Sequence, residues 1–275
     1  MANYTAADIK ALREATGAGM MDVKKALDEA DGDRTKATEI LRVKGLKGVT
    51  KREGRSASNG LVRTHVEDGV GTMVEVNCET DFVAKNPKFG ELADTVLAQA
   101  VAVAATDAES LLASELDGKT VKEVLDEANA GIGEKIEVRR VARVTGDQVV
   151  SYLHKTNPDL PAQIGVLVAT TGGDEQVARD IAMHVAAFSP SVLTRDEIDA
   201  TTVANERRIA EETAREEGKP EQALPKIVEG RVNGFFKENV LVDQAFAKDP
   251  KKTVGQVAKE AGAQVTGFAR FKVGV

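Results

Sequence analysis

Cysteine and aromatic residues are both scarce in this chain of 275 residues. It contains no Trp, two Tyr, eight Phe and a single cysteine, Cys78. One cysteine excludes an internal disulfide and any metal site built from several cysteines. With so few large aromatic side chains available for packing, a Phe that lies outside a strand or helix needs an explanation.

Targeting segments and a basic surface are missing as well. The first residues, MANYTAADIKALREA, lack a basic region followed by an apolar run, so we expect no signal peptide. No window approaches about 20 uninterrupted apolar residues, so we expect no membrane span. The net charge of -7 argues against a protein that mainly grips nucleic acid. The length predicts two or three compact units, and these absences predict a cytoplasmic protein with no direct nucleic-acid or membrane partner.

Residues 5–45 have the apolar spacing of three short helices, the third of which is predicted to end at Gly45. Such a short segment has little core, so we expect a docking domain at 1–50. Within it, Met20 and Met21 either fill the core or form an exposed contact surface. The stretch that follows, KGLKGVTKREGRSASNG, mixes Lys and Arg with Gly and Ser. It predicts a basic flexible linker at 51–59, although a basic tract can also bind RNA.

The rest of the chain contains an internal duplication. Four segments recur in the same order: MVEV (73–76) with GVLV (165–168), LADTVLAQAVA (92–102) with VARDIAMHVAA (177–187), TVKEVLDEA (120–128) with TVGQVAKEA (253–261), and KIEVRRVARV (135–144) with VTGFARFKV (265–273). The first pair is predicted to form strands, the last pair alternates as strands do, and the inner pairs form a predicted helical layer. The order predicts an α+β fold with two core subdomains, 60–146 and 147–275, each an antiparallel sheet with helices on one face.

The two copies differ in the link between their first predicted strand and helix. The first copy uses the 15 residues Asn77–Glu91, which include ETDFVAK, whereas the second uses the eight residues Ala169–Gln176. The fold therefore does not require the longer link. Phe82 within it either folds back as a lid on the local core or projects to dock in a pocket of a partner.

A second difference is an insertion in the second copy, at about 194–240. TVANERRIAEETAREE and PEQALPKIVEGRVNGFFKEN flank GKP, with dense charge and a thin apolar stripe that includes Ile209. This pattern predicts a helical hairpin, an antiparallel coiled coil that projects from the core. It serves either as a binding arm or as a purely structural one.

No catalytic set of residues is evident. His65, His154 and His184 are scattered without partners at metal-ligand spacing, and Cys78 lies in a strand-like run as a small buried hydrophobe. The sequence before GKT fails as a phosphate-binding loop, because Ala113 stands where its first glycine belongs. A binding protein is favoured over an enzyme, and we expect no cofactor and no bound metal.

Two stretches, LREATGAGMMDVKKAL (12–27) and EVNCETDFVAK (75–85), resemble the signatures of the bacterial elongation factor Ts family. The similarity continues through IGVLV, IAMHVAA, PKIVEGRV and DPKKTVGQVAKEAGAQVTGFARFKVG to cover essentially the whole chain. It implies an N-terminal three-helix module like a ubiquitin-associated domain, a duplicated α+β core and an inserted coiled-coil hairpin. The family often has a further C-terminal helix beyond GFARFKVG, where this sequence stops at Val275.

The resemblance also implies a function, guanine-nucleotide exchange on the translational GTPase elongation factor Tu. The partner would be bound in its GDP-bound and nucleotide-free forms, and GDP release would follow displacement of Mg²⁺. The family's wedge corresponds here to Thr80, Asp81, Phe82 and Val83. Further partner contacts implied by matching positions are Arg13, Met20, Met21, Lys24 and His154. A chaperone-like or RNA-adjacent translation accessory is the alternative, and a GTPase-type enzyme comes third.

Overall fold

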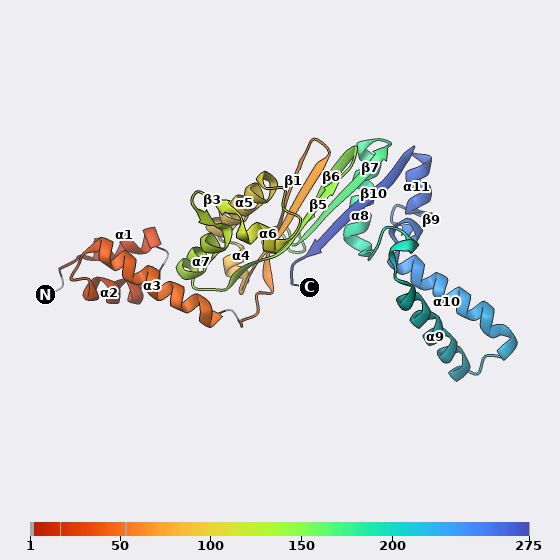
Figure 1. Ribbon diagram of the computed structural model, residues 1–275, viewed down its shortest axis with the longest axis horizontal. Helices are drawn as coiled ribbons and strands as arrows, with labels where there is room; N and C mark the ends of the chain where they lie inside the picture. The colour runs from red at the N-terminus through yellow and green to blue at the C-terminus, as the bar shows by residue number, and fades with distance from the viewer. Residues whose placement is uncertain (1–2, 17, 53, 275) are drawn as a thin grey trace.

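The computed structural model describes residues 3–16, 18–52 and 54–274, with only the backbone for 46–51. The molecule is elongated, with three helices at one end, two sheets in the middle and a helical hairpin at the other end (Figure 1). Among the described residues, none of the helices combines the length and apolar character needed to cross a bilayer.

The N-terminal end contains the three predicted helices, α1 (Ala6–Thr16), α2 (Met20–Glu29) and α3 (Arg34–Arg52). They pack around a small apolar core of their own, which consists of Leu12, Val23, Ala26, Leu27, Ala30, Ala37 and Leu41. The apolar spacing of 5–45 therefore identified the three helices correctly. The likeness to a ubiquitin-associated domain and the boundary at residue 50 remain predictions.

The predicted end of the third helix at Gly45 is wrong, because α3 continues to Arg52 and includes the first residues of the proposed linker. Gly45 serves a packing role instead. A Cβ atom at this position would lie only 2.5 Å from the Cβ of Ala130 in α7 (Val121–Ile132). The absent side chain lets α3 approach α7 closely, so the helix spans from the N-terminal core to the first sheet.

The first sheet has the order β1-β2-β5, with both pairs antiparallel. Its strands are β1 (Asn59–Glu67), β2 (Val70–Cys78) and β5 (Ile136–Thr145). One face is covered by helices, above all α5 (Pro87–Ala102) and α7, around a core that includes Val74, Val76, Phe89, Val96 and Leu125. The minor elements between them are α4 (Asp81–Ala84), α6 (Ala108–Ala113), β3 (Glu115–Leu116) and β4 (Lys119–Thr120).

The second sheet repeats this plan with the order β10-β7-β6, again antiparallel. Its strands are β6 (Gln148–His154), β7 (Ile164–Gly172) and β10 (Ala263–Lys272). The helices α8 (Glu175–Phe188) and α11 (Val254–Glu260) pack on it around Val166, Val168, Ile181 and Val254. The short elements in this half are η1 (Arg195–Glu197), η2 (Glu221–Ala223), η3 (Leu241–Asp243), β8 (Ala245–Phe246) and β9 (Asp249–Thr253). The predicted α+β architecture with antiparallel sheets is thus present in both halves.

The two sheets pack against each other through a reciprocal contact of glycines with large side chains. A Cβ at Gly71 of β2 would lie 3.0 Å from a methyl carbon of Leu167 in β7. A Cβ at Gly165 of β7 would lie 2.8 Å from the sulfur of Met73 in β2. Met73 lies two residues after Gly71 and packs on Gly165. Leu167 lies two residues after Gly165 and packs on Gly71. The contact is thus reciprocal, with each middle strand supplying both a glycine and the side chain that packs on the other glycine.

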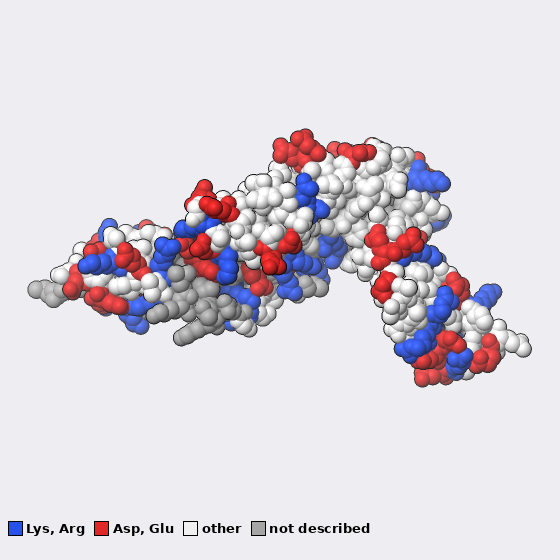
Figure 2. Space-filling model, viewed as in Figure 1, with Lys and Arg blue, Asp and Glu red and all other residues white. Residues whose placement is uncertain are grey.

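The insertion forms two packed helices, α9 (Ala200–Glu216) and α10 (Leu224–Asn239), which project away from the sheets (Figure 1). Their own apolar cluster contains Ala210, Val228 and Val232. Ile209 was wrongly assigned to this stripe, because it is 42% exposed. Acidic and basic side chains alternate along the hairpin (Figure 2), in ion pairs such as Arg207–Glu229 and Arg231–Glu217. The hairpin is therefore as predicted, while its description as a coiled coil stays a prediction.

Candidate functional site

The link between β2 and α5 contains a helical turn. α4 (Asp81–Ala84) follows the end of β2, and α5 begins at Pro87 behind the N-cap Asn86. The second copy needs only Gly173 and Asp174 between β7 and α8. Both predicted links were too long because the strands and helices extend further than expected. The first copy nevertheless has a longer link that its fold does not require.

Phe82 projects from this turn into solvent. Its side chain is 81% exposed, the largest exposed fraction among the big apolar side chains of the described residues. The next two residues, Val83 and Ala84, are 9% and 4% exposed and belong to the core of the first sheet. The turn is therefore anchored on its inner side while Phe82 points outward. The interpretation of Phe82 as a lid on the local core is wrong.

Asp81 shares the exposed side of the turn with Lys85. The Lys85 ammonium donates a hydrogen bond of 2.8 Å to Oδ2 of Asp81. This bond lowers the pKa of the Asp81 carboxyl and raises that of the Lys85 ammonium. Because both side chains are partly exposed, the pair stabilises the turn only slightly and can be replaced by other partners.

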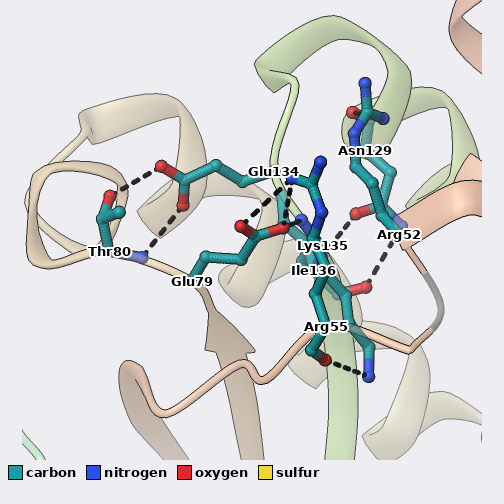
Figure 3. A network of polar contacts seen from close by, with 8 residues as sticks. All are labelled: Arg52, Arg55, Glu79, Thr80, Asn129, Glu134, Lys135 and Ile136. Carbon is teal, nitrogen blue, oxygen red and sulfur yellow. Dashed lines mark hydrogen bonds and ion pairs between the residues drawn. The ribbon is translucent and has the colours of Figure 1, made fainter. Parts of the chain in front are cut away.

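Thr80 holds the start of the turn from the inside. Its Oγ1 accepts a hydrogen bond from the backbone N–H of Val83, as an N-cap does. The backbone N–H and the hydroxyl of Thr80 donate to the two carboxylate oxygens of Glu134, at 3.0 and 2.7 Å (Figure 3). The half-buried Glu134 lies just after the end of α7 and was not identified from the sequence. Its partner is 54 residues away, and no local pattern signals such a contact.

Cys78, at the end of β2, also contacts Thr80. Its thiol donates to the carbonyl oxygen of Thr80 at 3.2 Å. Burial, together with the nearby Glu134 carboxylate, raises the pKa of the Cys78 thiol to about 12. A thiol with such a high pKa is not a nucleophile near neutral pH. The sequence-based interpretation of Cys78 as a small buried hydrophobe is confirmed.

Glu79 connects the turn to the end of the N-terminal helices. Its carboxylate accepts from the backbone N–H of Lys135 at 2.7 Å and pairs with the guanidinium of Arg55 at 3.3 Å. The Lys135 ammonium in turn donates to the carbonyl oxygen of Arg55 at 3.1 Å. At the end of α3, Arg52 donates to the carbonyl oxygen of Asn129 at 3.1 Å. Figure 3 shows these contacts together with those between Thr80 and Glu134 at the start of the turn.

Comparison with known proteins gives a consistent result over the whole chain. The family model described as elongation factor TS matches residues 79–275. Proteins named elongation factor Ts are similar to the chain over all of its length and all of theirs. They include those of Micrococcus luteus at 68% identity, Beutenbergia cavernae at 66% and Kocuria rhizophila at 64%.

The chain belongs to the elongation factor Ts family. The resemblance seen in the two signature stretches is thereby confirmed. The exposed Phe82 turn lies at the start of the part that the elongation factor Ts family model matches. The chain is accordingly assigned to a family of translation elongation factors.

The structure of this elongation factor Ts family member also locates the other predicted contact residues. Arg13 and Met20 line a hollow of about 690 Å³ on the N-terminal helices. Met20 and Met21 are 58% and 62% exposed, so the interpretation of these methionines as core filler is wrong. Lys24 is exposed on the same helix, α2. All four residues are therefore accessible, and partner contact by them stays a prediction.

His154 is exposed at the end of β6, where its Nδ1 lies 3.2 Å from the hydroxyl of Tyr152. The segment after it runs beside β1, since the carbonyl oxygen of Ala162 accepts from the N–H of Val62 at 2.9 Å. The segment that follows His154 thus runs beside β1, the strand on which α4 also packs.

The other two histidines, His184 and His65, make contacts within the fold. His184 is fully buried, with Nε2 2.8 Å from the Oε1 of Gln244, and Nδ1 accepts from the N–H of Ala247 at 3.2 Å. Burial lowers the pKa of His184. His65 is on the surface beside Glu67. No group of three or more His, Cys, Asp or Glu side chains with metal-site geometry occurs in the part of the chain that the structure describes.

Proposed function

We propose that this chain is a guanine-nucleotide exchange factor for elongation factor Tu. It binds the GTPase in its GDP-bound form, promotes the release of GDP and holds the nucleotide-free form until another nucleotide enters. The observation that carries this proposal is the exposed Phe82 on a turn anchored to the core. The chain works without a cofactor and without chemical turnover, on a protein partner in the cytoplasm.

Phe82 provides an apolar wedge on a short rigid support. An aromatic side chain that enters a pocket between partner elements gains burial energy, and such anchors dominate many interfaces. Because Val83 and Ala84 fix the turn in the core, the push of Phe82 is transmitted to the partner rather than absorbed by a flexible loop. The partner's own elements then have to move.

The movement matters because the nucleotide of a GTPase is held by charge. Mg²⁺ bridges phosphate oxygens and protein ligands and neutralises the phosphate charge. A wedge that shifts the elements around the phosphates displaces Mg²⁺ and weakens the hold on GDP. By thermodynamic linkage, a factor that lowers GDP affinity a thousandfold has its own affinity lowered a thousandfold by GDP, a coupling of about 4 kcal/mol.

Asp81 contributes a polar contact beside the wedge. In the free protein its carboxylate is paired with the Lys85 ammonium, which keeps Asp81 ionised and oriented on the exposed side of the turn. On the partner, the carboxylate exchanges Lys85 for hydrogen-bond donors near the phosphate site. Thr80 and Val83 point inward, so we assign them the task of holding the turn rather than touching the partner.

Three further surfaces contribute contacts to the partner besides the wedge. The face with Arg13, Met20, Met21 and Lys24 docks on the GTPase as a second attachment, and the exposed methionines suit such an adaptable contact. His154 and the segment after it contribute another contact. The hairpin of α9 and α10 is a third arm, an antiparallel coiled coil whose contact is secondary.

The test is the release of labelled GDP from purified elongation factor Tu. Catalytic amounts of the protein should speed release many-fold, with GDP recovered unchanged. Raising Mg²⁺ should oppose the effect, since the metal and the factor bind antagonistically. Release at the spontaneous rate over a range of protein and Mg²⁺ concentrations would refute the proposal.

A further inference from the structure

Glu79 and Glu134 tie the end of β2 to the start of β5 by a reciprocal exchange of hydrogen bonds. The Glu134 carboxylate accepts from the backbone N–H of Thr80, the residue after Glu79, at 3.0 Å. The Glu79 carboxylate accepts from the backbone N–H of Lys135, the residue after Glu134, at 2.7 Å. Each acid thus satisfies the amide that follows the other (Figure 3). The position of Glu134 relative to Thr80 is therefore fixed from both sides.

The contact of Glu134 with Thr80 reproduces a capping box with the acid supplied from elsewhere in the chain. At the start of α7, Thr120 and Glu123 form an ordinary capping box within one helix, with Glu123 accepting from the N–H of Thr120 at 2.8 Å. In α4 the residue equivalent to Glu123 is Val83, which is buried in the core. The turn cannot place an acid there without losing its anchor, and Glu134 supplies the carboxylate instead.

A single helical turn depends on such a cap more than a long helix does. α4 has four residues, and a nucleus of this size is unfavourable by itself because few hydrogen bonds offset the ordering of its backbone. Inside the turn, the N–H groups of Val83 and Ala84 donate to the Oγ1 and the carbonyl oxygen of Thr80. If Thr80 rotates, both acceptors move and the direction of Phe82 changes.

We propose that Glu134 is a positioning residue for Phe82. It accepts two hydrogen bonds from Thr80 and so holds the aromatic ring in one orientation before the partner binds. This inference rests on the proposed exchange function. Glu134 needs no contact with the GTPase. A turn that is not yet ordered must be ordered during binding, and this ordering uses part of the binding energy of Phe82. Glu134 orders the turn beforehand, so more of that energy is available for nucleotide release.

The experiment compares Glu134→Ala with a matched control, Glu123→Ala, which removes the same kind of cap from α7. Labelled GDP release from elongation factor Tu is measured at varied GTPase concentration. For Glu134→Ala we expect kcat to fall about tenfold with KM changed less than about twofold, as for a lost charge-assisted hydrogen-bond pair that acts in the step of nucleotide release. Glu123→Ala should release GDP like the wild type. Equal kcat for Glu134→Ala and the wild type would overturn the proposal.

A double variant shows whether Glu134 acts through Phe82. In the background of Phe82→Ala, the added change Glu134→Ala should slow release no further, since there is no ring left to orient. If the double variant released GDP about tenfold more slowly than Phe82→Ala, Glu134 would support exchange independently of Phe82. That result would contradict a positioning role. Glu134→Gln, which keeps one acceptor oxygen, should recover part of the kcat and provides a milder variant if Glu134→Ala folds poorly.

Amide hydrogen exchange tests the turn without any partner. In Glu134→Ala the Val83 and Ala84 amides should exchange about tenfold faster, while in Glu123→Ala they should exchange as in the wild type. Unchanged protection of these amides in Glu134→Ala would refute the positioning role. If the wild-type protein fails to speed GDP release, the exchange function itself is refuted, and that result is separate from the behaviour of the turn.

Discussion

Phe82 and Val83 are neighbours in one helical turn, yet their side chains have opposite surroundings, with Phe82 81% exposed and Val83 9% exposed. The turn therefore separates a residue that can meet a partner from a residue that holds the turn in place. This difference predicts different consequences for stability and for function when the two are truncated.

Truncation of Phe82 and truncation of Val83 should have different effects on the thermal stability of the protein. Phe82→Ala removes an exposed ring, so the melting temperature should stay within about 1–2 °C of the wild type. Val83→Ala removes buried methyl groups and should cost about 1–3 kcal/mol of the free energy of unfolding. Calorimetry of both variants measures this. A large fall in melting temperature for Phe82→Ala alone would place the ring in the core.

The reciprocal glycine contact between the sheets predicts an overpacking effect. Gly165→Ala puts a methyl group against Val62 and within 2.8 Å of the sulfur of Met73, so we expect a loss of about 1–3 kcal/mol. Gly234→Ala is the control, because a Cβ there meets nothing within 4 Å and Ala favours the helix α10. Urea unfolding measures both variants. Equal stability of Gly165→Ala and the wild type would mean that Val62 and Met73 move aside without cost, which would contradict the overpacking effect.

The hairpin should be separable from the core. Replacing residues 203–235 by a short Gly/Ser linker removes most of α9 and α10 and their own apolar cluster. It leaves Glu238 and Asn239, whose carbonyl oxygens accept from Gln244 and Ser191. The core should keep a single cooperative unfolding transition. Loss of that transition would show that the hairpin is part of the core.

Cys78 should resist alkylation in the folded protein. Its pKa is raised from 9.0 to about 12, so the folded state holds the thiol proton more tightly than the unfolded chain does. The stability that results is present below about pH 9 and is lost as the pH rises from there to about 12. At pH 8 a thiol reagent should modify the protein slowly until denaturant is added. Equally fast modification in both states would contradict this.

Much of the fold follows from local patterns in the sequence. The mostly apolar strand of β2 and the helical spacing of α5 each appear again in β7 and α8, so the duplicated plan could be predicted without the structure. Gly45 misled because a glycine ends a helix in one context and permits close helix packing in another. Only the position of Ala130, far away in the sequence, decides between these roles.

The candidate site was predictable in part. Phe82 was identified because its segment is longer than the fold requires, and this comparison uses sequence alone. Glu134 was missed because its contact with Thr80 spans 54 residues and depends on how α7 ends beside β2. The αL conformation of Gly133, with φ of 86°, ends α7 and places Glu134 there. Such a contact is visible only once the chain has folded.

The most direct test of the central claim is the rate of labelled GDP release from elongation factor Tu with equal catalytic amounts of wild-type protein and Phe82→Ala. The account predicts strong acceleration by the wild type and a loss of about tenfold or more in Phe82→Ala, as for an aromatic hot-spot residue. Asp81→Ala should show a smaller loss, because it keeps the ring. Full acceleration by a folded Phe82→Ala variant would contradict the account.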